Sequence, residues 1–201
     1  MSSEDQEQAQ LIEGLQRGDA KSFRTLIDRY QASVFQVCLR MMRSEAEAED
    51  MAQETFIRVS QSITQFRGDS SLSTWLYRVA INLCKNRIAY LKRRAQLKHD
   101  SLGQLEEQGG DVWQDKVKGG KLPDSPEELV EGREAEKLLV QALRDLPDSL
   151  REVLILRDIE GLSYAEIAEI VQLPLGTVKS RIHQARISLM ESYNALQQGA
   201  R

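Results

Sequence analysis

The spacing of hydrophobic residues predicts helices through the first hundred positions. Between residues 23 and 41 the apolar positions recur every three or four residues, which places them on one stripe of a helix. These are Phe23, Leu26, Ile27, Tyr30, Val34, Val37, Cys38 and Met41. A second helix over about 45–63 turns Met51, Phe56, Val59 and Ile63 inward, and the acidic residues at its start suit the positive end of the helix dipole. Residues 66–74 carry a glycine and several serines and are predicted to form a loop.

A third helix, beginning near Ser73 or Thr74, has two contrasting faces. At 100° per residue, one face is apolar: Leu76, Tyr77, Ala80, Ile81, Cys84, Ile88 and Leu91. The other face lines up Trp75, Asn82, Asn86 and Arg93, with Arg78 and Lys85 beside them. Aromatic rings stack on unpaired bases, amides bond base edges and cations hold phosphates, so this face is predicted to bind nucleic acid. The alternative for Trp75 is that it caps the hydrophobic core.

The last third of the chain has the pattern of a helix-turn-helix. One helix begins near Leu146-Pro-Asp148 and ends at Gly161, and Ser163 with Glu166 forms a capping box for a short helix. Pro174 and Gly176 are predicted to make the turn, and Thr177 to cap the next helix. The inward residues of that last helix are Val178, Ile182, Ala185 and Leu189. Ser180, His183, Gln184 and Ile187 point away from this stripe, with Lys179 and Arg186 on its flanks. Such a helix can insert in a major groove, although two short helices and a turn can also be purely structural.

Glycine and proline punctuate the segment between these two helical parts. Half of the 12 glycines and two of the 4 prolines fall between residues 103 and 132. We therefore predict an all-α protein of two small helical domains, 1–98 and 127–201, joined by a flexible linker over 99–126. A flexible segment of that length spans about 30 Å on average, so nothing is expected to fix the spacing of the two domains in the free chain.

Charge is unevenly distributed in this chain, whose 201 residues have a net charge of −4. From Ser70 to His99 there are seven basic residues and no acidic one, and residues 170–190 contain Lys179, Arg181 and Arg186 without an acid. A solvated helix face usually mixes both signs. Two local basic stretches in an acidic protein instead predict two contacts with a polyanion.

Composition excludes several other classes of protein. Aromatic residues make up 5% of the chain and period-two runs are absent, which argues against a β-sandwich. No stretch of about 18 apolar residues is present to cross a membrane, and residues 1–10 are too polar for a signal peptide, so a cytoplasmic protein without membrane insertion is expected. Cys38 and Cys84 fit a reduced core, and two histidines are too few for a metal site or triad. No catalytic cluster is visible, so neither an enzyme nor a cofactor is predicted.

Five motifs in fixed order resemble one family. They are Asp50-Met-Ala-Gln53-Glu54-Thr-Phe56, Phe66-Arg-Gly-Asp69-Ser, Thr74-Trp-Leu-Tyr-Arg-Val-Ala-Ile-Asn82, Ser163-Tyr-Ala-Glu-Ile-Ala168 and Gly176-Thr-Val-Lys-Ser-Arg-Ile182. Together they resemble the extracytoplasmic-function (ECF) class of bacterial RNA polymerase sigma factors, over about 20–98 and 134–195. The resemblance implies that region 2 binds the polymerase clamp and the −10 promoter element. It also implies that region 4 binds the flap tip and the −35 element, with a linker in place of a folded region 3.

The resemblance also implies roles for individual residues and partners. Core polymerase binding is assigned to Asp50, Gln53, Glu54 and Phe56. The −10 element, as single-stranded DNA with a flipped base, is assigned to Phe66, Trp75, Arg78, Asn82, Lys85 and Asn86. The −35 duplex is assigned to Thr177, Lys179, Ser180, His183, Gln184 and Arg186. His183 and Gln184 stand where relatives often carry an aromatic and an arginine, so no −35 consensus is transferred.

Two further expectations concern how the protein acts. An anti-sigma factor is an expected partner, beside core RNA polymerase and promoter DNA. The alternative is an autonomous helix-turn-helix repressor or activator with an unrelated N-terminal sensor domain. This hypothesis explains the C-terminal third equally well, but it does not explain why the third helix has a face of tryptophan, asparagine and basic residues.

Overall fold

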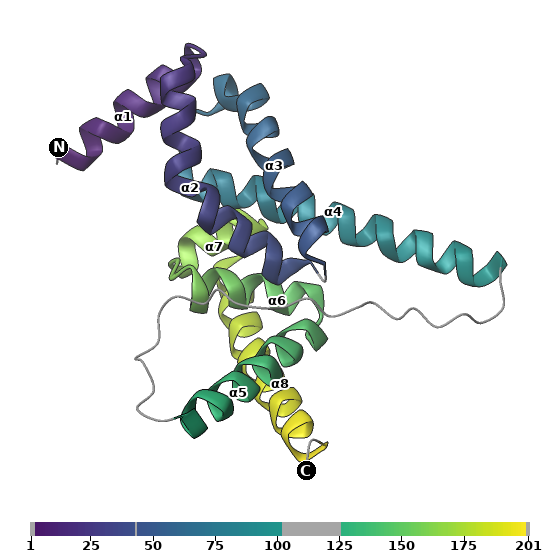
Figure 1. The fold of residues 1–201 in the computed structure, drawn as a ribbon. Helices are drawn as coiled ribbons and strands as arrows, with labels where there is room; N and C mark the ends of the chain where they lie inside the picture. The colour runs from purple at the N-terminus through teal and green to yellow at the C-terminus, as the bar shows by residue number, and fades with distance from the viewer. Residues whose placement is uncertain (1–2, 43, 102–125, 200–201) are drawn as a thin grey trace.

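The structure is a computed structural model, and it describes residues 3–42, 44–101 and 126–199. Its elements in chain order are α1 (Ser3–Gln16), α2 (Ala20–Met41), α3 (Glu45–Ser62), the 3-10 turn η1 (Ile63–Gln65), α4 (Leu72–Ser101), α5 (Pro126–Asp145), α6 (Asp148–Leu154), the π-helical turn η2 (Ile155–Ile159), α7 (Tyr164–Val171) and α8 (Leu175–Gly199). Figure 1 shows their arrangement, with the far end of α4 projecting from the body. The described residues form helices and turns without a strand, which confirms the all-α prediction.

The N-terminal half is a bundle of α2, α3 and α4. Asp19 caps α2 by accepting the backbone N–H of Ser22 at 2.8 Å, and Ser44 caps α3. The apolar stripe predicted for α2 is confirmed, since Leu26, Val34 and Val37 are fully buried while the flanking aromatic residues are half-buried. Helices α2 and α3 bury one face of α4, and another part of its surface packs against the C-terminal half.

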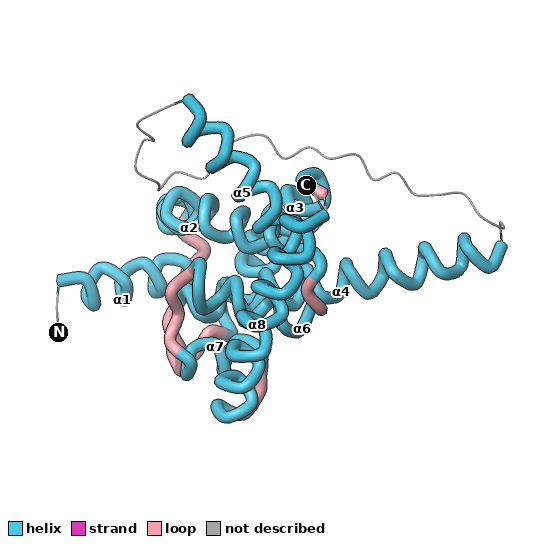
Figure 2. The backbone as a smooth tube through the Cα atoms, turned by 90° about the horizontal axis from the view of Figure 1, so that it is seen from below, coloured by secondary structure: helices cyan, strands magenta, loops and turns pink. Residues whose placement is uncertain are grey.

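Helix α1 is an element that the hydrophobic pattern did not reveal. The large apolar side chains buried among its described positions, 6–16, are Leu11 and Leu15, too short a stripe to stand out in the sequence. Gly14 allows α1 to approach α2 closely, because a Cβ at this position would lie 2.1 Å from the Ser22 hydroxyl oxygen. In Figure 2 the N-terminal end of α1 extends away from the body of the molecule.

The C-terminal half packs α5 and α6 against α8, and α7 with α8 forms the helix-turn-helix. The capping box of Ser163 and Glu166 is confirmed. The predicted cap at Thr177 is wrong, because α8 begins at Leu175 and the N–H of Val178 already donates to the Pro174 carbonyl. The turn is instead made by residues 172–174, with Gln172 in the left-handed conformation at φ 55°.

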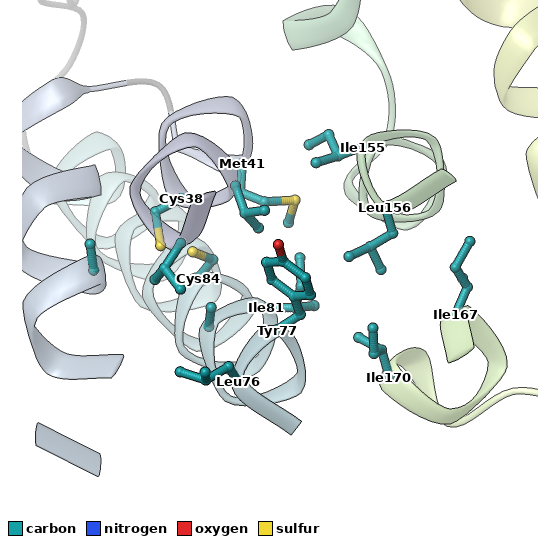
Figure 3. Close-up of a cluster of buried hydrophobic side chains, with 14 of the residues drawn as sticks. Cys38, Met41, Leu76, Tyr77, Ile81, Cys84, Ile155, Leu156, Ile167 and Ile170 are labelled. Atoms are coloured by element: carbon teal, nitrogen blue, oxygen red, sulfur yellow. The ribbon is translucent and has the colours of Figure 1, made fainter. Parts of the chain in front are cut away.

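The two halves of the chain share one continuous hydrophobic cluster. Figure 3 shows Tyr77 of α4 between the N-terminal helices and the side chains of Leu156 and Ile170 from the C-terminal half. The expectation that the two domains are independently placed in the free chain is therefore wrong. Each half leaves apolar residues on its outer face after burying its own core. Packing the two halves together buries these residues and removes their apolar surface from water.

The predicted linker is placed only at its ends. Residues 99–101 belong to α4 and residue 126 begins α5, whereas residues 102–125 lie outside the described part of the chain. Helix α4 is therefore three residues longer than the predicted domain boundary at 98.

Candidate functional site

One face of α3 presents polar side chains to solvent. Asp50 and Gln53 are exposed and Glu54 is half-buried, and their spacing of three and four places them on one side of the helix. The opposite side of α3 is anchored by buried small residues, including Ala48 and Ala52. Arg58 donates to Glu54 at 2.8 Å within the helix. The polar face is thus available for a partner.

Two apolar residues at the edge of this face differ in exposure from what was predicted. Phe56, assigned by the family resemblance to polymerase docking, is half-buried against the core. Ile57 is 49% exposed instead, one turn beyond Gln53 on the same side as Asp50. A single exposed apolar side chain is ordinary on a protein surface, so Ile57 adds an apolar contact to the polar face without by itself marking a docking site. The signal for Ile57 was present in the sequence as an apolar residue one position off the inward stripe.

At the start of α4, two aromatic rings pack on each other. The ring centroids of Phe66 and Trp75 are 5.2 Å apart, with the planes tilted by 47°. Phe66 is 6% exposed, and Trp75 is half-buried against the core. Trp75 therefore partly caps the hydrophobic core, which was the alternative interpretation of this residue, and its ring is not fully exposed to solvent. Trp75 presents the more accessible of the two rings.

Further along α4 the predicted polar face is open. Asn82, Asn86 and Arg93 are all exposed, and 100° per residue places them within about 40° of one another and of Trp75. The structure thus brings one aromatic edge, two amides and one cation onto a single strip.

Beside that strip, three cations of α4 meet acids of the C-terminal half. Arg78 donates to Glu169 of α7 at 2.7 Å, and the Lys85 ammonium lies 3.1 Å from the Glu152 carboxylate of α6. The third pair joins Lys92 and Asp148 at 2.5 Å. We call Arg78, Lys85 and Lys92 the basic stripe, and Asp148, Glu152 and Glu169 the acidic patch. Members of the basic stripe are seven residues apart, two turns of helix, so all three face the same way.

Glu152 is the most deeply placed acid of this interface. It is 1% exposed, and burial raises its pKa, an effect opposed by the nearby ammonium of Lys85. Arg181 of α8 lies 4.0 Å away and adds a second positive charge. Leaving a buried carboxylate without these cations is costly, typically several kcal/mol, so Glu152 depends on the contact with α4.

Two hydrogen bonds also join the halves near the same place, each with one charged partner. The Tyr77 hydroxyl donates to Glu160 at 2.8 Å, and burial with that carboxylate raises the tyrosine pKa. Arg151, 2% exposed, donates from Nη1 to the carbonyl of Met41 at 2.9 Å, at the C-terminal end of α2. A guanidinium there satisfies a helix carbonyl that lacks an intrahelical partner.

On α8 the predicted division into inner and outer faces is confirmed. Val178, Ile182 and Ala185 are buried. Four of the candidate DNA-binding residues are exposed: Ser180, His183 and Gln184 point away from the buried stripe, and Lys179 lies on its flank. Thr177 is half-buried, and its carbonyl accepts the Ser180 hydroxyl at 2.9 Å.

Arg186 differs from these because it is already engaged. Its guanidinium donates to both oxygens of Asp158 in η2, at 3.0 and 2.5 Å. Hydrogen bonding with this carboxylate raises the pKa of Arg186. A contact from Arg186 to DNA therefore requires an exchange of partners.

The described residues contain no group of histidine, cysteine or acidic side chains suited to hold a metal ion. Cys38 and Cys84 are free thiols in the core. Within 3–42, 44–101 and 126–199, every helix is too short or too polar to cross a bilayer.

Comparison with known proteins identifies both halves of the chain. The family described as Sigma-70 region 2 matches residues 26–94, and Sigma-70, region 4 matches residues 136–189. The RNA polymerase sigma-H factor of Pseudomonas aeruginosa is 38% identical over 196 residues, covering 98% of each chain. The ECF RNA polymerase sigma-E factor of Haemophilus influenzae is 39% identical over 178 residues, 88% of this chain and 89% of that one.

Solved structures give the same fold. CnrH, in its complex with the cytosolic domain of CnrY, superposes with a TM-score of 0.65 at 20% identity, over 94% of this chain and 97% of that one. RpoE of Bartonella quintana, in complex with the anti-sigma factor NepR, gives 0.62 at 22% identity, over 87% and 98%. Taken with the family matches over both halves, these findings show that the chain belongs to the ECF class of RNA polymerase sigma factors, the subunits that direct core polymerase to promoters and promote transcription initiation.

Proposed function

We propose that three helical faces of this sigma factor each bind a different partner. The α3 face docks on core polymerase, the exposed strip of α4 reads the −10 element, and the outer face of α8 reads the −35 duplex. The observation that carries this assignment is the polar, largely exposed surface on each helix directly opposite its buried stripe. The functional units are 1–98 and 127–201, joined through 99–126. The protein works in the bacterial cytoplasm, without a cofactor and without catalytic chemistry of its own.

At the −10 element, the strip on α4 fits an unpaired base. Extruding a base from the duplex costs a few kcal/mol of stacking, which a protein must offset with stacking and hydrogen bonds. Trp75 offers the accessible ring, with Phe66 supporting it from below at 5.2 Å between centroids. The amide of Asn82 can bond the base edge, while Asn86 and the neighbouring cations Arg78 and Lys85 follow the strand.

The −10 assignment is tested by promoter opening. Asn82→Ala is expected to reduce the signal of a fluorescent base analogue in the −10 element, measured with core polymerase, because the flipped base loses a hydrogen-bonding partner. Polymerase binding and helicity should stay at wild-type levels, since exposed substitutions usually change stability by no more than about 0.5 kcal/mol. Gln31→Ala, at an exposed position of α2, is the matched control.

Trp75 requires a different substitution, since it also packs on the core. Trp75→Phe keeps much of that packing and is expected to reduce opening less than Trp75→Leu, which keeps bulk but removes the ring. Opening equal to wild type in both Asn82→Ala and Trp75→Leu would show that this strip does not read the −10 element.

At the −35 element, α8 presents short polar groups to the major groove. Gln184 can bond adenine in two places, whereas an arginine would favour guanine. Lys179 and Thr177 at the start of the helix lie where phosphates flank an inserted helix. His183 and Ser180 complete the outward face, and Arg186 can join it by leaving Asp158.

A base-preference experiment tests that reading of α8. Gln184→Ala is expected to relax the choice of base at one −35 position, by about 1–3 kcal/mol for a good bidentate contact. Lys179→Ala is the matched comparison, since losing a phosphate contact weakens all sequences about equally. Binding to a randomised −35 library, in complex with core polymerase, measures both. An unchanged preference at every position in Gln184→Ala would remove Gln184 from sequence readout.

An anti-sigma factor completes the proposed partners. Two solved structures with the same fold are CnrH in complex with the cytosolic domain of CnrY, and the sigma factor RpoE in complex with the anti-sigma factor NepR. The exposed faces of α3 and α8 are the surfaces such a protein must cover to keep polymerase or promoter away. Affinity purification of the tagged chain from its own host, before and after stress, tests whether such a partner travels with it.

A further inference from the structure

A side-chain hydrogen bond ties the end of α1 to the segment that leads into α4. Gln16, the last residue of α1, donates from its amide Nε2 to the carbonyl oxygen of Phe66 at 2.9 Å, across 50 residues of chain. Phe66 follows the 3-10 turn η1 in an extended conformation, with φ −70° and ψ 115°, and α4 begins only at Leu72. The Phe66 carbonyl therefore lies outside both helices and needs a donor from elsewhere, which Gln16 supplies.

The backbone that carries Gln16 is firmly placed. Its neighbour Leu15 is 1% exposed and belongs to the hydrophobic core, where α1 lies beside η1. On the other side the chain turns sharply into α2: the N–H of Gly18 donates to the Leu15 carbonyl at 3.0 Å, and that of Asp19 donates to the Gly14 carbonyl at 2.9 Å. Gly18 adopts φ 76°, a conformation that favours glycine at the end of a helix. Gln16 is thus held between a buried anchor and a tight turn.

The acceptor of this bond also supports the aromatic pair at the start of α4. The Phe66 ring is 6% exposed, and its centroid is 5.2 Å from that of Trp75. Residues 67–69 are exposed, and beyond them Ser71 fixes the other end of the loop: its hydroxyl accepts the N–H of Thr74 at 3.0 Å, and its carbonyl accepts the N–H of Trp75 at 3.0 Å. The loop is therefore held at both ends, and α1 supplies one of the two attachments.

We propose that Gln16 is a positioning residue for the −10 element: by holding the Phe66 carbonyl it fixes the aromatic pair on which an extruded base stacks, without touching the DNA itself. The inference rests on the proposed role of α4. A base binds more tightly to a ring that is already in place, because ordering a loop during binding costs free energy. Helix α1 thereby contributes to promoter recognition through the loop rather than through a contact of its own.

The test uses the full chain assembled with core polymerase. Affinity is measured for a synthetic promoter whose −10 strands are unpaired, and opening of the duplex promoter is followed with a fluorescent base analogue. Gln16→Ala is expected to weaken both by about threefold to tenfold, the size expected for one lost hydrogen bond. Gln16→Glu keeps the shape of the side chain but places an acceptor against the carbonyl, so its loss should be at least as large.

Another glutamine of the same helix provides the matched control. Gln10 is exposed, and at 100° per residue it lies on another side of α1 than Gln16. Gln10→Ala and Gln10→Glu make the same chemical changes and should bind and open promoters like wild type. All four variants should keep wild-type helicity, melting temperature and affinity for core polymerase, because both side chains are exposed.

An abasic site distinguishes positioning of the rings from a general effect on the fold. Placed in turn at each position of the unpaired −10 strand, it removes one base and leaves the backbone. At the position of the extruded base, Gln16→Ala and wild type are expected to bind equally, because no base is left to stack. In a Trp75→Leu chain, Gln16→Ala should likewise add no further loss, since the ring through which it acts is gone.

Three results would overturn the inference. One is wild-type binding and opening by Gln16→Ala while Asn82→Ala and Trp75→Leu are impaired. The second is a loss that persists at every abasic position, and the third is a loss of full size in the Trp75→Leu chain; either indicates a direct contact with the strand or a general effect on the fold. Normal opening in both Asn82→Ala and Trp75→Leu is a separate outcome, which removes the α4 assignment and the inference with it.

Discussion

The double variant Asp50→Lys, Glu54→Lys is expected to lose core polymerase binding by about a hundredfold or more, because like charges brought together at an interface cost several kcal/mol. Both side chains lie on the polar face of α3 with Gln53 and Ile57. The change should leave helicity and melting almost unaltered. Among the described residues, the exposed bridge from Arg58 to Glu54 is the one that is lost, and such i,i+4 pairs contribute about 0.3–0.5 kcal/mol.

The chain offers a closely matched control for this experiment. Glu13→Lys with Asp28→Lys also reverses two acids, and Glu13 is bridged to Arg17 four residues on, as Glu54 is to Arg58. Equilibrium binding of labelled protein to purified core polymerase distinguishes the two variants. Equal affinity of the α3 variant and wild type would remove this face from polymerase docking.

Val178→Asp is expected to unfold the C-terminal half. Val178 is fully buried in the helix-turn-helix, and an unpaired charge there costs several kcal/mol against a total stability of about 5–15 kcal/mol. Ile182→Asp, one turn later, should act in the same way. Because both halves share one hydrophobic cluster, the N-terminal half should also lose packing around Tyr77 and melt at lower temperature.

Circular dichroism and thermal melting measure this effect. Lys179→Asp places the same side chain at the neighbouring exposed position and should leave the melting temperature close to wild type. A folded Val178→Asp protein with native helicity would contradict the placement of Val178 in the core, and with it the assignment of the outer face of α8.

Sequence periodicity was enough to predict which residues of α2, α4 and α8 face the core. It was not enough for α1, whose two buried leucines make too short a stripe, or for the start of α8. There, Gly176 and Thr177 looked like a turn and a cap, but Pro174 supplies the first helix carbonyl and both residues lie inside the first turn. Capping and turn residues predict where a helix begins. The prediction fails when a residue earlier in the chain already accepts the first hydrogen bond of the helix.

Helix periodicity also could not predict how the two halves pack together, and the physical cause is different. A run of cations without acids on α4 indicated a polyanion, and the structure supplies carboxylates from residues far along the chain. Asp148, Glu152 and Glu169 are unremarkable in sequence, because nothing local distinguishes an acid that meets a distant cation from one that meets water. Trp75 shows the same limit, since its angle on the helix placed it outward while Phe66 packs against it.

The pairing of Arg186 with Asp158 has a consequence for how DNA binding responds to salt. A basic side chain that neutralises a phosphate normally releases counter-ions from the DNA, which makes affinity fall steeply as salt rises. In the proposed contact of Arg186 with DNA, the cation first leaves a carboxylate that acts as its own counter-ion, and salt weakens that internal pair as well as the contact with DNA. The two effects oppose each other, so the steepness of the salt dependence at the −35 element underestimates how many basic side chains touch the phosphates.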